Sequence, residues 1–171
     1  MIIGIFIRNF KTYQGVNFIP LSNEHNFCGL LGKNGIGKSS VLEALDCFFN
    51  DKGWTYHFSV KKNGLAKVRP YIVPIFALDK NSDDITDDLK TIFEVLDSLF
   101  RETDKEDFNF GSANTTVKET FIALRDEIVN NQSLNSKYII PIGIDYEKKE
   151  TSSTIFDSVY KSKHPDRKST R

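Results

Sequence analysis

The chain of 171 residues has little of several residue types, and each shortage excludes a class of protein. Its two cysteines, Cys28 and Cys47, form no CxxC pair and have no histidine cluster beside them. This excludes a disulfide framework and indicates reduced, packed thiols in a cytoplasmic protein. The 23 basic residues balance 23 acidic ones, so the composition gives no general basic surface for nucleic acid. The apolar start, MIIGIFIRNF, lacks a basic leader and is too short to span a bilayer, and we expect no membrane contact.

Apolar periodicity predicts the first elements of a single compact domain. Two strands are expected at Ile2–Arg8 and Gly15–Leu21, joined by a turn at Asn9–Gln14. The short apolar run Phe27–Leu31 suits a strand that is buried on both faces. A helix is expected over Ser39–Phe49, because its apolar residues recur at helical spacing.

A glycine-rich stretch, GLLGKNGIGKSSVLEAL, joins the third strand to this helix. Within it GKNGIGKS fits the Walker A pattern GxxxxGK[ST], in which backbone N–H groups and the positive end of a helix dipole hold phosphates. Lys38 is expected to reach the β and γ phosphates of ATP, the Ser39 hydroxyl to ligate Mg²⁺, and Ser40 to open the helix. A glycine-rich turn capped by serines is the alternative, which the strand before and the helix after disfavour. The predicted nucleotide-binding residues are Gly32, Lys33, Asn34, Gly35, Ile36, Gly37, Lys38, Ser39 and Ser40.

The sequence GKNGIGKSSVLEAL resembles the ABC-type ATPase heads of the SMC, Rad50 and RecF proteins and of the OLD-family nucleases, whose loops read GxNGxGKS before a leucine-rich helix. The upstream IFIRNFKTYQGVNFIPL is similar to the first hairpin of those heads. The resemblance covers residues 1–50, less than a third of the chain. It implies that Arg8, Asn9 and Lys11 lie near the nucleotide, and a solvated turn is the alternative for these three residues.

Two later apolar runs, Val68–Leu78 and Lys137–Tyr146, also predict strands. They contain Pro70, Pro74 and Pro141, and proline cannot donate to a ladder of backbone hydrogen bonds. We therefore expect edge or irregular strands at both places.

Between these runs, Asp84–Arg101 and Thr116–Asn130 place apolar residues along one face of a helix each. A helical cover on the sheet is the favoured interpretation, and a surface for DNA or a partner is the alternative. The fold class predicted is α/β, a P-loop NTPase with an ABC-ATPase-like N-terminal lobe, a mixed sheet and a helical insertion. The expected division is 1–82 for the hairpin, Walker A loop and helix, 83–132 for the helical insertion, 133–160 for a further strand of the lobe, and 161–171 for a disordered polar tail.

Other motifs of an ABC-type head are missing from the sequence. No glutamine loop, LSGGQ-like signature or hhhhDE Walker B strand is evident. IVPIFALDK ends in Asp79 but has Lys80 in place of the catalytic glutamate, and IIPIGIDYE reaches Asp145 after interruption by Pro141 and Gly143. No catalytic residue is assigned, and the chain is interpreted as the N-terminal lobe of a longer ATPase.

The sequence thus predicts an ATP- and Mg²⁺-binding lobe of an SMC/RecF/OLD-like ATPase, acting in DNA repair or maintenance or in anti-phage defence. The resemblance implies a homodimer or higher oligomer formed through ATPase heads, a partner nuclease or effector subunit, and DNA as a further partner. A nucleotide-binding regulatory module without hydrolysis of its own is the alternative. A small-molecule kinase fits the length but not the NGIGKSS loop.

Overall fold

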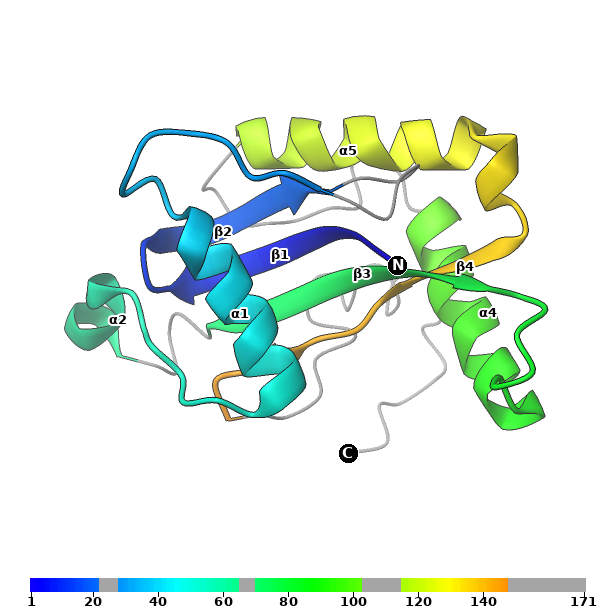
Figure 1. The fold of residues 1–171 in the computed structure, drawn as a ribbon, viewed down its shortest axis with the longest axis horizontal. Coiled ribbons are helices and arrows are strands. Elements are labelled where there is room, and N and C mark those ends of the chain that lie inside the picture. Colours follow the sequence, from blue (N-terminus) through cyan, green and yellow to red (C-terminus); the bar gives the residue numbers. More distant parts are fainter. Residues whose placement is uncertain (22–27, 65–69, 103–114, 148–171) are drawn as a thin grey trace.

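The computed structural model describes residues 1–21, 28–64, 70–102 and 115–147, and the predicted tail at 161–171 lies outside these ranges (Figure 1). None of the helices in the described ranges has the length and apolar character that a bilayer crossing requires. The elements, in chain order, are β1 (Ile2–Phe10), β2 (Tyr13–Pro20), α1 (Lys38–Asn50), α2 (Phe58–Asn63), β3 (Tyr71–Asp79), α4 (Asp87–Glu102), α5 (Thr115–Asn130), the 3₁₀ helix η2 (Gln132–Leu134), β4 (Lys137–Pro141) and β5 (Ile144–Asp145).

The strands form one sheet in the order β2-β1-β3-β4, with β5 also paired to β3. Every pairing among the described strands is antiparallel, so the predicted mixed sheet is not observed there. The predicted strand Phe27–Leu31 is also not found among the described strands. Phe27 lies outside the described residues, residues 28–31 join no strand, and Leu31 is 95% exposed. An apolar run of this kind forms a central strand only between two neighbours, and no described strand pairs with it.

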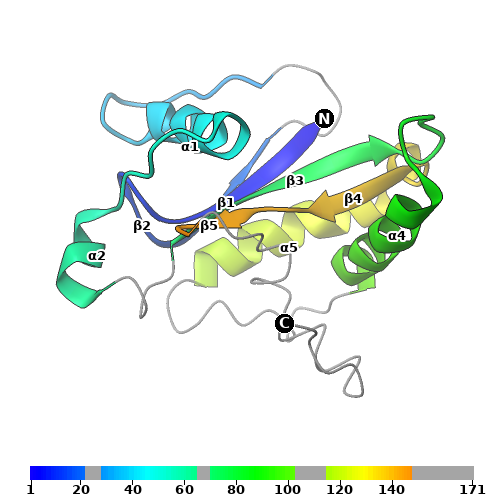
Figure 2. The same ribbon diagram turned by 90° about the horizontal axis from the view of Figure 1, so that it is seen from below.

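Both faces of the sheet are covered by helices. Figure 2 shows α1 on one face and α5 on the other, with α4 beside β4 at the edge. Successive side chains of a strand point to opposite faces, so Phe6 of β1 packs in the core that includes α5 residues, whereas Ile5 and Ile7 pack with α1. The ring of Phe121 in α5 lies 5.0 Å from that of Phe6 and 5.2 Å from that of Phe18, measured between centroids.

The helix α4 buries only part of the apolar face that periodicity predicts, which consists of Leu89, Ile92, Phe93, Leu96 and Phe100. Phe93 and Leu96 are partly buried and pack against the core cluster of Ile140. Phe100 is buried as expected, but Leu89 and Ile92 are 39% and 53% exposed. The buried residues of α4 are instead at its C-terminal half, where Asp97 accepts the backbone N–H of Ile139 at 2.8 Å. The helix is therefore fixed to the edge strand β4 by its second half.

The strand β3 is central although it contains proline, so the expectation of an edge strand is wrong, whereas the alternative of an irregular strand agrees with the register shift of β1 against β3 between Ile2 and Gly4. The first two residues of the predicted range, 68 and 69, lie outside the described residues. Pro74 lies opposite Ile5 of β1 on one side, and on the other side its carbonyl accepts the N–H of Ile142 at 3.2 Å. Ile142 is in the break between β4 and β5, so the missing N–H of Pro74 faces an interruption of the ladder. The backbone passes very close here, because a Cβ on Gly143 would collide with Ile72 and Val73. The edge prediction is confirmed for β4.

Candidate functional site

The loop before α1 has a backbone that requires glycine. Gly37, the residue before the first helical one, has φ 103° and ψ 9°, a left-handed conformation that other L-residues rarely adopt. A Cβ at this position would lie 2.8 Å from the Thr12 Oγ1 and 3.1 Å from the Tyr13 hydroxyl oxygen. The N-cap residue Gly37 has no side chain that could cap α1, and the first turn of the helix has no acidic residue. The N–H groups of that turn therefore remain available to a ligand, and they favour an anion.

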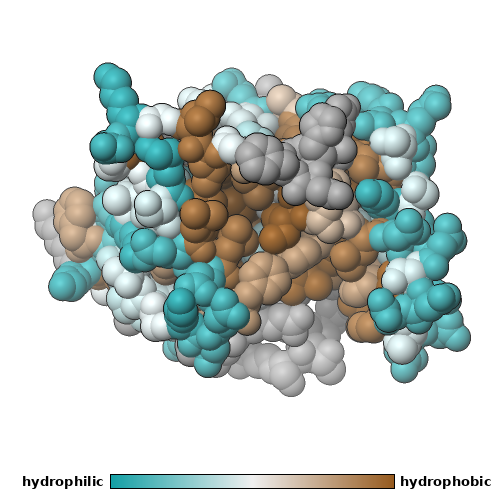
Figure 3. All heavy atoms as spheres, viewed as in Figure 1, coloured by the Kyte–Doolittle hydropathy of each residue, from teal (hydrophilic) through white to brown (hydrophobic). Residues whose placement is uncertain are grey.

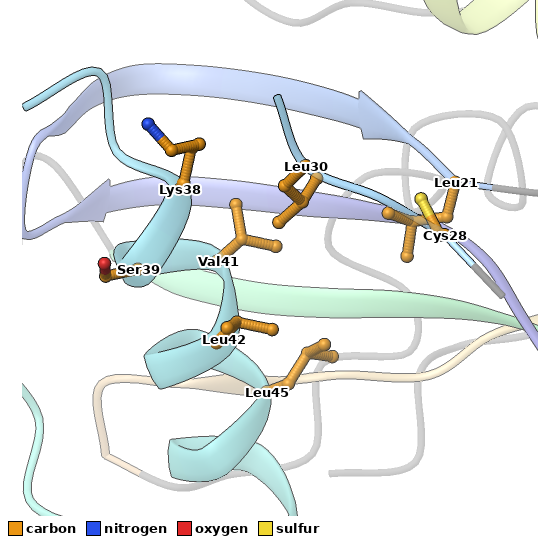
Figure 4. Close-up of a pocket in the computed structure, with 8 residues that line it drawn as sticks. All are labelled: Leu21, Cys28, Leu30, Lys38, Ser39, Val41, Leu42 and Leu45. Carbon is orange, nitrogen blue, oxygen red and sulfur yellow. The ribbon is translucent and has the colours of Figure 1, made fainter. Parts of the chain in front are cut away.

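The ammonium group of Lys38 is held by the loop. Its Nζ donates to the carbonyl of Gly32 at 2.6 Å and to the carbonyl of Lys33 at 2.8 Å. An ammonium group has three N–H donors, so two hold it in place over the loop and the third remains for another acceptor. Figure 4 shows Lys38 and Ser39 together at the start of α1, ahead of the apolar residues Val41 and Leu45.

The two serines at the start of α1 have different surroundings. Ser40 is buried, and its hydroxyl lies 3.2 Å from the Thr12 hydroxyl, for which Thr12 is the donor. Ser39 is exposed at the surface of the first turn. The hydroxyl of Ser39 is thus the one placed to meet a ligand or a cation from solvent. Within the described ranges, no group of three or more His, Cys, Asp or Glu side chains is arranged to hold a metal ion by itself.

The turn between β1 and β2 packs against this helix N-terminus. Lys11 forms an ion pair with Glu43 of α1. Asn9 is buried and braces the turn, because its side-chain oxygen accepts the N–H of Gly15 at 2.8 Å and its carbonyl accepts the N–H of His57 at 2.9 Å. Of these two predicted site residues, Lys11 therefore lies beside α1, whereas the polar groups of Asn9 are used inside the turn.

Arg8 is directed to the other face of the sheet. It pairs in register with Tyr71, and its guanidinium carbon lies 5.7 Å from the centroid of the Tyr71 ring. Tyr71 belongs to the core that packs with α5, on the side opposite α1. The Nε of Arg8 is buried and has no hydrogen-bond partner among the described residues. The structure does not bring Arg8 to the glycine-rich loop.

Neither carboxylate considered for a Walker B motif lies beside the loop. Tyr71 is at the loop end of the sheet and Asp79 ends the same strand eight residues later, about 26 Å away at 3.3 Å per residue. The N–H of Asn81 donates to the Asp79 carboxylate, which places this group in a turn. Asp145 pairs in register with Tyr71 and so shares the face that packs with α5. Its carboxylate accepts the N–H of Glu147 at 2.9 Å.

An apolar groove runs from the loop along α1, and we call it the α1 groove. In Figure 3 apolar side chains gather on the face of the molecule that carries α1. Leu42 of α1 is 63% exposed and Phe49 is 56% exposed. The groove begins at the loop itself, since its lining combines polar residues of the first helical turn with apolar ones. The lining residues are Leu21, Cys28, Leu30, Lys38, Ser39, Val41, Leu42 and Leu45.

Three residues of this site were not predicted from the sequence. They are Thr12 and Tyr13 on the hairpin turn and Glu43 on α1. Burial raises the pKa of Tyr13 above its ordinary value. The signal for the first two was present in the hairpin sequence NFKTY, but the sequence does not tell which of its side chains point at the helix.

The antiparallel sheet, the glycine-rich loop and the uncapped helix N-terminus define an α/β domain suited to binding a phosphate-bearing nucleotide. The chain belongs to the AAA ATPase domain family, whose sequence profile matches residues 1–170. It is also similar to structural maintenance of chromosomes protein 1 of Saccharomyces cerevisiae (strain ATCC 204508 / S288c), with 31% identity over 85 residues. That match covers 48% of this chain and 6% of the yeast protein, so the chain spans a small part of its relative. No solved structure matches the chain.

These similarities confirm the predicted kinship with SMC-like ATPases. Membership of an ATPase domain family implies nucleotide binding, usually with Mg²⁺. The side chains at the N-terminus of α1 suit both the phosphates of a nucleotide and Mg²⁺. The free N–H of the Lys38 ammonium suits a phosphate oxygen, and the exposed Ser39 hydroxyl suits Mg²⁺, which takes oxygen ligands.

Proposed function

We propose that the loop from Gly32 to Ser40 binds Mg-ATP and that the chain is the ATP-binding lobe of an SMC/RecF/OLD-like ATPase. The observation that carries the proposal is the position of Lys38, whose ammonium group is fixed by the carbonyls of Gly32 and Lys33 with one donor to spare. A phosphate group over the loop would accept that donor together with N–H groups of the first turn of α1. Bound ATP would supply the phosphates that these groups hold, and Mg²⁺ would neutralise part of their charge.

In this proposal Ser39 is the protein ligand of Mg²⁺, since the hydroxyl of Ser40 is buried against Thr12. Lys11 lies beside α1 and would add positive charge near the nucleotide, in competition with its ion pair to Glu43. Asn9 would act indirectly, by holding the turn. We assign Arg8 no contact with the nucleotide, because its side chain lies beside Tyr71 on the face of the sheet opposite α1.

The α1 groove supports the proposal that this lobe works within a larger ATPase. A contiguous exposed apolar surface on a globular domain marks a place where another polypeptide segment packs. We propose that further strands of the ATPase cover the groove and pair with residues 28–31, which join no strand among the described residues. Two complete heads would then enclose the nucleotide between them, so that binding and hydrolysis close and open a dimer. DNA maintenance or anti-phage defence, with DNA and a partner nuclease or effector, is the process we propose.

The second candidate is a regulatory module that binds nucleotide without hydrolysing it. The positions of Asp79 and Asp145 favour it, since the first is at the far end of β3 and the second shares the face of Tyr71. Neither is placed to orient a water molecule at the loop. The ATPase lobe and the regulatory module share the same nucleotide site. They differ in ATP hydrolysis, which only the first should show when a longer form of the protein is assayed.

The test of the shared site is the substitution Lys38→Ala, with Lys33→Ala as a matched control. Loss of a hydrogen-bonded charge on the phosphates should weaken ATP binding by about ten- to a hundredfold in calorimetry with Mg-ATP. Lys33 contributes its backbone carbonyl to the loop, which alanine retains, so the control should bind ATP far better than Lys38→Ala does. Equal ATP affinity for the wild type and Lys38→Ala would remove the basis of the proposal.

A further inference from the structure

The carbonyl of Gly37 accepts two hydrogen bonds at the junction of loop and helix. The hydroxyl of Tyr13 donates to it at 3.2 Å, across 24 positions of sequence. The N–H of Val41 also donates to it at 3.2 Å, as the first hydrogen bond of α1. One of these donors belongs to the helix itself, and the other reaches it from the turn between β1 and β2.

This pair of hydrogen bonds fixes the direction of a backbone N–H group. The Gly37 carbonyl and the Lys38 N–H belong to one planar peptide group, and no peptide bond among the described residues is cis. In a trans peptide the two groups point in opposite directions. Because the carbonyl is held toward Tyr13 and Val41, the Lys38 N–H is held pointing out of the N-terminus of α1, where the phosphates would lie.

Glycine at position 37 makes this restraint necessary. A glycine backbone moves between conformations more freely than that of any other residue, so the peptide group after it needs an external hold. Thr12 supplies a second contact one turn further on, through the hydroxyl of Ser40 at 3.2 Å. The turn that carries Thr12 and Tyr13 is itself braced, because the N–H of Lys11 donates to the carbonyl of Thr55 at 3.0 Å.

We propose that Tyr13 is a positioning residue for the phosphate-binding loop, with Thr12 as its second contact. It acts through Gly37, and it sets the direction of the Lys38 N–H without touching the nucleotide. The inference rests on the proposed function, since it assigns Tyr13 a part in nucleotide binding. It predicts a specific defect. Removal of the Tyr13 hydroxyl weakens the hold on the outer phosphates and leaves the rest of the nucleotide unaffected.

The experiment compares Tyr13→Phe with the wild type in calorimetric titrations with ATP, ADP and AMP. ATP and ADP affinity should fall by about two- to tenfold, the effect of one ordinary hydrogen bond, while AMP affinity should change less. A variant that merely destabilised the fold would weaken all three nucleotides by the same factor, so the ratio of ATP to AMP affinity separates the two roles. Tyr56→Phe is the matched control, since this half-buried tyrosine lies on the neighbouring segment and should leave the ratio unchanged.

The outcomes separate this inference from the proposed function. No ATP binding by the wild type would overturn both. ATP binding by the wild type with an unchanged ATP-to-AMP ratio in Tyr13→Phe would overturn the role of Tyr13 alone. If Tyr13→Phe does not fold, Thr12→Val removes the second contact with little change of shape and should lower the same ratio, and an unchanged ratio there would equally overturn the inference.

Discussion

Individual residues of the hairpin turn hold an uncommon backbone conformation next to the loop. Asn9 has φ 53° and Lys11 has φ 48°, in the left-handed region that residues other than glycine occupy infrequently. Asn9 tolerates this because its side chain bonds to the N–H of Gly15 within the same turn. The surrounding contacts therefore determine the shape of the turn that carries Thr12 and Tyr13 to α1.

At the same scale, the buried tyrosine Tyr71 should make stability depend on alkaline pH. Burial raises its pKa, and the nearby Arg8 charge opposes this only in part. A folded-state pKa above the unfolded value of about 10 gives stability that is complete below that value and is lost as the pH rises toward the folded pKa. Between about pH 8 and pH 11, urea unfolding should show a steeper loss of stability for the wild type than for Tyr71→Phe. Parallel curves for the two proteins would contradict this.

Site residues could be predicted where the spacing of a sequence motif sets their position. They could not be predicted where the register between two strands sets it. The loop from Gly32 to Ser39 has a fixed spacing, and the structure has Lys38 and Ser39 in the first turn of α1, while their contacts with a nucleotide stay a prediction. The position of Lys11 depends instead on a register shift of β1 against β2 between Arg8 and Phe10, whereas Arg8 precedes the shift and shares the face of Phe6 by the ordinary alternation of a strand. An irregularity of this kind changes which face a side chain takes and has no sequence signature here. The resemblance placed three residues near the nucleotide, and only Lys11 lies beside α1.

At the scale of elements, a buried carboxylate fixes α4 to the sheet. One oxygen of Asp97 accepts both the N–H of Ile139 in β4 and the Nε of Arg101, each at 2.8 Å. Arg101 in turn donates to the carbonyls of Leu134 and Lys137. Hydrophobic periodicity did not predict this, because it assigns buried positions to apolar residues only.

Asp97→Ala should therefore destabilise the fold strongly. It leaves the buried N–H of Ile139 and the largely buried Nε of Arg101 without their acceptor, and breaking a buried pair on one side costs about 3 to 5 kcal/mol. Asp126→Ala removes a half-exposed partner of Arg125 from α5 and should cost less than about 1 kcal/mol. Urea unfolding of both variants measures the difference, and similar free energies of unfolding for the two would refute the assignment.

At the scale of the whole molecule, the elements were predicted better than their assembly. The hairpin, the helix after the loop and the helix α5 all form close to their predicted bounds. The mixed sheet and the strand at Phe27–Leu31 were both expected, but the described strands pair only antiparallel and none of them pairs with residues 28–31. Strand propensity is local, whereas pairing depends on other segments, and the sequence of one run does not contain that information.

The arrangement of carboxylates predicts that the chain of 171 residues binds ATP but releases phosphate slowly. Glu43 is paired with Lys11, Asp79 ends β3 far from the loop, and Asp145 shares the face of the sheet opposite α1. Phosphoryl transfer to water requires a group that orients the nucleophile. Phosphate release by the purified chain should stay near background at several protein concentrations. Rapid turnover that Asp79→Asn or Asp145→Asn abolishes would identify that residue as catalytic and contradict the prediction.

The two cysteines differ in exposure, so the expectation of packed thiols is confirmed for Cys47 and wrong for Cys28. Cys28 is exposed and lines the α1 groove, whereas Cys47 is buried in α1 with its thiol donating to the carbonyl of Lys52 at 3.2 Å. A maleimide dye applied to the native protein would thus attach at a single position without any engineered substitution. Its emission would report whether the groove faces water or another polypeptide, so the natural sequence already carries the attachment point for a fluorescent sensor of assembly.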